Sequence, residues 1–253
     1  MPATHVLLLA LAGLGAGLTG SVAGLASLVS YPALLATGLG PVSANVTNTV
    51  ALVFSGIGSS IGSRPEIAGQ GARLRRLGAT AAVGGLLGGA LLLVTPADAF
   101  ERLVPWLIGV ASITILLRPQ RAALHMHSHP HVPGDSRLLQ LGVLAVAIYG
   151  GYFGAAAGVL MVALLLAATS ESLPRSNAVK NVVLGIANAV AALAFAVLGP
   201  VHWAAVMPLG LGFLVGGRLG PVVVRRAPAG ALRTVIGGAG LALAVHLGLD
   251  AYH

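Results

Sequence analysis

Residues 20–32 read GSVAGLASLVSYP, and residues 149–160 read YGGYFGAAAGVL. Each of these stretches, rich in small residues, lies in the middle of a long apolar run, at about 5–38 and about 138–170 respectively. A straight helix over the first run would be roughly 50 Å long, whereas the hydrocarbon core of a bilayer is roughly 30 Å thick. We therefore predict that each run breaks midway into a hairpin of two half-helices.

The composition places the whole chain in the membrane. Hydrophobic residues make up 57% of the 253 residues and charged residues only 8%, and the mean hydropathy is +0.94. A soluble domain carries about a quarter charged residues. Further apolar stretches lie at about 42–62, 75–95, 100–118, 177–199, 203–218 and 229–249. The sequence thus predicts an all-α polytopic membrane protein.

The two halves of the sequence share a pattern of glycine, proline and polar residues. In the same order along the chain, Gly20, Gly24, Pro41, Ser43 and Asn48 match Gly154, Gly158, Pro174, Ser176 and Asn181. We expect a first transmembrane repeat over 1–118, a polar His-rich linker over 119–136 and a second repeat over 137–253. Each repeat would contain one broken-helix hairpin and three further transmembrane helices. The glycine clusters at 84–89 and 212–220 are expected to serve helix packing.

The distribution of basic residues favours the hairpins over simple spans. Cytoplasmic loops of membrane proteins are enriched in Lys and Arg. Eight simple spans would put seven of the fourteen basic residues on each side, whereas two returning hairpins put thirteen inside and only Arg102 outside. In that arrangement both termini lie outside, the linker is cytoplasmic and the repeats have inverted topology. Inverted repeats with broken helices are typical of secondary transporters, which bind substrate near the bilayer midplane.

The chain resembles the TauE/SafE family of sulfite and organosulfonate exporters over nearly its full length. The resemblance lies in four parts of the sequence. They are the glycine-rich stretch at 20–32 with the LLATGLGPVSAN that follows at 34–45, the glycine-rich stretch at 149–160, SNAVKNVVLGIAN at 176–188 and GPVHWAAVMPLGLGFLVGGRLG at 199–220. It implies a pseudo-symmetric α-helical transporter for sulfite, sulfonates or related small carboxylate or sulfur oxyanions. The first hairpin has fewer consecutive glycines than is usual in the family, so the substrate does not carry over.

Broken helices point backbone N–H groups and positive dipole ends at the midplane, which favours an anion there. Lys180 stands out because it is a basic residue inside an apolar segment, where ionisable residues are functional candidates. Its alternative role is that of a topology anchor that extends to the cytoplasmic headgroups. Asn48 and Asn181 could bind substrate or form interhelical hydrogen bonds. The candidate substrate-binding residues are Ser21, Gly24, Asn45, Thr47, Asn48, Gly154, Gly158, Asn177, Lys180 and Asn181.

The acidic residues all lie in predicted loops or at the chain ends, so no carboxylate is predicted within the membrane as a proton relay or sodium ligand. We also find no paired nucleophile and base there, and cysteine is absent, so we predict neither an enzyme nor a bound cofactor. The expected partners are the lipid bilayer of the bacterial inner membrane and a small anionic substrate, without nucleic acid. A homodimer is left open.

The linker sequence HMHSHPH places four histidines at alternating positions, namely His125, His127, His129 and His131. Histidine-rich tracts are compositional metal signals. A divalent metal cation permease that uses this linker is therefore the alternative function. The predicted membrane interior lacks the ligands that a cation pathway would need, and the second interpretation of the histidines is a tolerated low-complexity linker.

Overall fold

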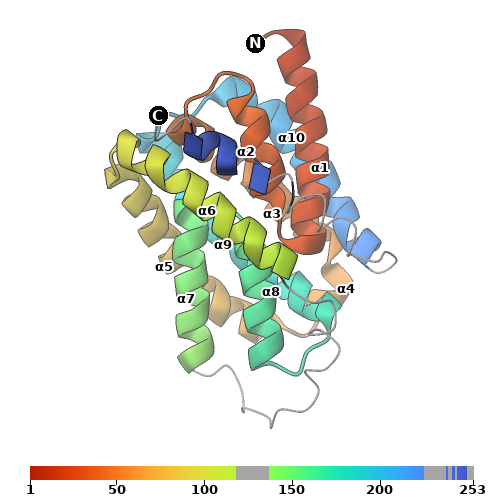
Figure 1. Cartoon of the computed structure of the whole chain (residues 1–253). Coiled ribbons are helices and arrows are strands. Elements are labelled where there is room, and N and C mark those ends of the chain that lie inside the picture. Colours follow the sequence, from red (N-terminus) through yellow and green to blue (C-terminus); the bar gives the residue numbers. More distant parts are fainter. Residues whose placement is uncertain (118–136, 225–237, 239–240, 243, 250–253) are drawn as a thin grey trace.

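The computed structural model describes residues 1–117, 137–224, 238, 241–242 and 244–249. Within those residues the regular structure is entirely helical, which confirms the predicted all-α class (Figure 1). The helices are α1 (Ala3–Ala23), α2 (Ala26–Leu35), α3 (Pro41–Gly62), α4 (Arg64–Ile67), α5 (Gly71–Val94), α6 (Ala97–Leu117), α7 (Arg137–Tyr152), α8 (Ala157–Ala168), α9 (Leu173–Leu198) and α10 (Trp203–Val224). The histidines of the linker and most of the last apolar stretch lie outside the described residues.

Both long apolar runs break where the glycine-rich stretches predict. The chain turns between α1 and α2 at Gly24, whose φ of 75° lies in the left-handed region that glycine adopts without strain. It turns between α7 and α8 at Gly154, with a φ of 76°, and Ala156 follows in the same region. The turning glycines are thus Gly24 and Gly154. This differs from the sequence register, which pairs Gly24 with Gly158, because Gly158 lies inside α8.

The two hairpins enter the molecule from opposite ends and meet in its middle. In Figure 1 the N-terminus of α1 lies at the top, whereas α7 begins at the bottom. The hairpin tips touch at Gly24 and Gly158, where a Cβ on Gly24 would lie only 2.6 Å from the Gly158 Cα. The contact requires two residues without side chains, which explains glycine at both positions.

Glycine faces also hold the long helices together. Gly84, Gly85 and Gly88 of α5 lie against the backbone of α7 and α9, and Gly212, Gly216 and Gly217 of α10 lie against α1 and α3. A Cβ at most of these positions would overlap a backbone atom of the neighbouring helix. Both clusters therefore serve close helix packing, as predicted.

The helix pairs in the two halves correspond. In the first half, α1 packs on α10 and α3 packs on α10 and α9; in the second half, α7 packs on α5 and α9 packs on α5 and α3. Each hairpin thus packs against a long helix of the opposite half. Helices α3 and α9 cross at Gly56 and Gly185, next to the two tips.

Among the residues that the structure describes, four helices are long and apolar enough to cross a membrane, namely α1, α5, α9 and the Trp203–Val222 part of α10. Helix α3 has 22 residues but carries Asn45, Asn48 and several hydroxyl side chains, which lower its hydropathy. Large apolar side chains remain exposed on most of the helices, among them Leu7, Leu11, Val83, Leu91, Val110, Leu141, Val197 and Leu211. Such extensive exposed apolar surface is suited to contact with lipid.

Candidate substrate site at the hairpin tips

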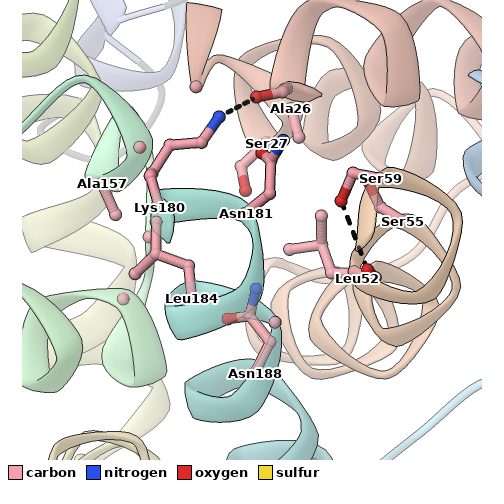
Figure 2. Close-up of a pocket in the computed structure, with 17 residues that line it drawn as sticks. Ala26, Ser27, Leu52, Ser55, Ser59, Ala157, Lys180, Asn181, Leu184 and Asn188 are labelled. Atoms are coloured by element: carbon pink, nitrogen blue, oxygen red, sulfur yellow. Dashed lines mark hydrogen bonds between the residues drawn. The ribbon is translucent and has the colours of Figure 1, made fainter. Parts of the chain in front are cut away.

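A cavity of about 70 Å³ lies between the two hairpin tips and the crossing of α3 and α9 (Figure 2). About 10–15 Å³ of such space suffices for one water molecule, so a small ion fits. Glycines and alanines from both tips form one side: Gly20, Gly24, Ala26, Gly150, Gly154, Ala157 and Gly158. The polar side chains of the lining are Ser27 of α2, Ser55 and Ser59 of α3, and Lys180, Asn181 and Asn188 of α9.

Lys180 supplies the charge of this cavity. Its side chain is 2% exposed, and its ammonium group donates hydrogen bonds to the carbonyl oxygens of Gly20, at 2.8 Å, and Ser21, at 3.3 Å. These carbonyls belong to the last turn of α1, where the helix dipole is negative and attracts a cation. The side chain is therefore buried between the helices and points to the first hairpin tip.

The neighbours of Lys180 on α9 also hold the first hairpin. Asn177 donates through Nδ2 to the Ser21 carbonyl at 2.8 Å, and Asn181 donates to the Ser21 hydroxyl at 3.4 Å. Ser21 is buried behind the tip and does not line the cavity. Three side chains at a helical spacing thus attach α9 of the second half to the end of α1.

The second hairpin is held in the same manner from the other half. Asn45 of α3 donates through Nδ2 to the carbonyl of Tyr152, the last residue of α7, at 2.8 Å. Beside this contact, Phe153 packs edge-on against Tyr31 of α2, and Phe100 of α6 packs against both Tyr152 and Phe153. Asn45 lies outside the cavity lining, so its observed role is to position the hairpin.

Two other candidates on α3 also have structural partners. Asn48 donates to the hydroxyl of Ser27 at 3.2 Å and accepts a hydrogen bond from Ser30 at 2.6 Å, both on α2. Thr47 accepts the backbone N–H of His202 at 2.9 Å. The structure therefore gives Asn48 the interhelical role and places Thr47 at the start of α10. Neither lines the cavity.

The structure thus divides the ten predicted site residues into two groups. Those that line the cavity are Gly24, Gly154, Gly158, Lys180 and Asn181. Those that hold the surrounding helices are Ser21, Asn45, Thr47, Asn48 and Asn177. Three polar residues of the lining on α3 and α9 were not among the candidates, namely Ser55, Ser59 and Asn188. Helical spacing gives the signal for them, because Ser55 and Asn188 lie seven residues after Asn48 and Asn181, and Ser59 lies four residues after Ser55.

The chemistry of the lining suits an anion. One ammonium group, three hydroxyl groups and two carboxamides surround the space, and all of them can donate hydrogen bonds. The first turn of α2 also begins at the cavity, and N–H groups at the start of a helix have no partner within that helix. In the first turn of α8, Ala157 and Val159 donate their N–H groups to the carbonyl oxygens of Gly154 and Ala156. The described part of the chain contains no group of three or more metal-ligating side chains.

Comparisons with known protein families and proteins bear on the function of this cavity. The model of the family described as Sulfite exporter TauE/SafE matches residues 9–247. The chain belongs to this family. Proteins similar to it include the probable membrane transporter protein YfcA of Escherichia coli K12, 26% identical over 83% of this chain and 77% of YfcA. The probable membrane transporter protein ORF9 of a Sinorhizobium species is 25% identical over 94% of this chain and 90% of its own. No solved structure matches the chain significantly.

Membership of the TauE/SafE family, together with the helical fold and the exposed apolar surface, identifies a membrane transporter. The match covers both hairpin tips and every residue of the cavity lining. The cavity at the hairpin tips is consequently the candidate substrate site of a TauE/SafE transporter.

Proposed function

We propose that this TauE/SafE protein exports a small sulfur-containing or carboxylate anion, such as sulfite or an organosulfonate, across the bacterial inner membrane. The observation that carries the proposal is the buried ammonium group of Lys180, which faces a cavity of about 70 Å³ between two broken helices. A buried cation within a membrane protein is costly unless it is paired or functional. An anion in the cavity supplies the missing charge.

The bound anion accepts hydrogen bonds from three kinds of donor. Lys180 turns from the carbonyls of Gly20 and Ser21 toward the anion, Ser27, Ser55 and Ser59 donate through hydroxyls, and the first turn of α2 donates backbone N–H groups. Because the tips themselves form the site, a rigid-body movement of either hairpin opens it to one side. We propose alternating access on this basis, with the two halves as inverted repeats. The opposite entry of the hairpins and the corresponding helix pairs support that arrangement (Figure 1).

We further propose that both termini lie outside and that the linker is cytoplasmic. Arg73, at the start of α5, and Arg175, at the start of α9, both contact Glu171 at 3.2 Å, so two loops with basic residues lie at the same end of the molecule. This agrees with the positive-inside rule. In that orientation an inside-negative potential drives an anion outward with about 2.3 kcal/mol per charge per 100 mV.

The proposal predicts that anions stabilise the purified protein against thermal unfolding. A ligand that binds the folded state raises the apparent melting temperature by mass action, by an amount that increases with concentration above Kd. Sulfite, methanesulfonate, thiosulfate and acetate would be compared with Ni²⁺, Co²⁺ and Zn²⁺ at constant ionic strength. We expect at least one anion to stabilise the protein.

Deletion of residues 123–134 is the control for the histidines of the linker. Metal stabilisation that disappears in the deletion variant would locate metal binding at the linker and would leave the anion result unchanged. If metals alone stabilise the protein, and still do so after the deletion, the protein is a cation permease and the proposal is wrong.

A further inference from the structure

We infer that the site selects anions with a single negative charge, and this inference rests on the proposed anion transport. Lys180 carries the only ionisable side chain among the described residues that line the cavity; the others are glycine, alanine, leucine, serine and asparagine. The hydroxyl and carboxamide groups orient an anion but carry no net charge. The side chains therefore present one positive charge to a ligand.

The helix ends add little to that charge. Each tip contains the C-terminus of one half-helix and the N-terminus of the next: α1 ends at Ala23 and α2 begins at Ala26, and α7 ends at Tyr152 and α8 begins at Ala157. The partial charges at the two kinds of helix end are equal and opposite. They cancel to a first approximation within each tip, so the backbone gives directional donors without a second full charge.

The described acidic side chains do not compensate Lys180 either. Lys180 donates hydrogen bonds to two backbone carbonyls, and Glu171 pairs with Arg73 and Arg175 outside the cavity. A monoanion therefore balances the charge of Lys180, whereas a dianion leaves one negative charge without a counter-charge in the partly enclosed cavity. Burial of an unpaired charge is strongly unfavourable. The site is expected to accept alkanesulfonates, hydrogensulfite and monocarboxylates and to exclude sulfate.

Methanesulfonate and sulfate test this inference, because both are tetrahedral and of similar size but carry one and two charges. Their affinities would be measured by isothermal titration calorimetry on the full chain in detergent at constant ionic strength. We expect sulfate to bind more weakly by about tenfold or more. Equal or tighter binding of sulfate by the wild type overturns the inference while it supports anion transport. Absence of binding by both anions, and by sulfite and acetate, overturns the proposed function itself.

A second cation in the cavity should change the selectivity. Ser55→Lys places an ammonium group on α3, across the cavity from Lys180, and we expect it to raise the affinity for sulfate relative to methanesulfonate by about tenfold. Ser55→Met, a neutral side chain of similar length, is the matched control and should leave the ratio unchanged. An unchanged ratio in a folded Ser55→Lys variant contradicts the inference. Ser59→Lys repeats the test one turn further along α3. If neither variant folds, the ratio of sulfate to methanesulfonate affinity in the wild type remains the test of the inference.

Discussion

A Lys180→Met variant is expected to bind its anion at least about 30-fold more weakly than the wild type, because loss of a charge-assisted hydrogen bond costs roughly 2 kcal/mol or more. Methionine keeps most of the length and apolar volume of lysine but lacks the ammonium group that donates to Gly20 and Ser21 and faces the cavity. Uptake into proteoliposomes and calorimetric affinity would both be measured. Transport should fall to the background of empty vesicles.

Arg175→Met is the matched control for this prediction. Arg175 also lies in α9, but it is partly exposed and pairs with Glu171 outside the cavity. Its replacement removes a positive charge from the same helix and should leave anion affinity within about a factor of two, since an exposed ion pair contributes little free energy. Wild-type affinity in a folded Lys180→Met variant would show that the ammonium group serves only to hold the first hairpin.

The second large effect is expected at the contact between the tips. Gly24→Ala should lower the free energy of unfolding by about 2–4 kcal/mol, as the sum of backbone strain and overpacking. Gly24 has a φ of 75°, and an added Cβ would lie 2.5 Å from the backbone nitrogen of Val159. The apparent melting temperature, followed by tryptophan fluorescence in detergent, reports the loss.

Substitutions of two other glycines distinguish backbone strain from overpacking as the cause of the lower stability. Gly38 has a φ of 87° in the loop after α2, but a Cβ there would meet nothing within 4 Å, so Gly38→Ala measures backbone strain alone, at about 1 kcal/mol. Gly158 has no such φ but faces Gly24, so Gly158→Ala measures the crowding of the tips. If Gly24→Ala destabilises the protein no more than Gly38→Ala, the tips do not require their close contact.

Much of the fold could be predicted from the sequence because the bilayer imposes a length. An apolar run of 34 residues cannot be one straight span, and small residues at its centre indicate where it turns. The predicted bounds of 42–62, 75–95 and 177–199 agree closely with α3, α5 and α9. The register within the tips could not be predicted in the same way, because the glycines that turn the chain and those that serve close contact look identical in the sequence.

The candidate site could be predicted only in part. Lys180 was identifiable because a charge inside an apolar segment is conspicuous, and the tip glycines followed from the hairpins. A list of polar residues, however, does not indicate which face of a helix they occupy relative to other helices. Asn45 and Asn177 point to the ends of hairpins from the opposite half, and these contacts depend on the way the halves pack. Ser55 and Asn188 reach the cavity for the same reason.

Each hairpin packs against a long helix of the opposite half, and this arrangement affects how the protein can be assembled during synthesis. Helix α1 precedes its main packing partner, α10, by roughly 180 residues in the chain. At a synthesis rate of about 5–20 residues per second, the glycine face of α1 remains without that packing partner for roughly 10–40 s. During this interval lipid or the insertion machinery must cover the groove that α10 later fills. The two halves are therefore one cooperative unit in biogenesis, and neither is expected to reach its native packing when it is synthesised alone.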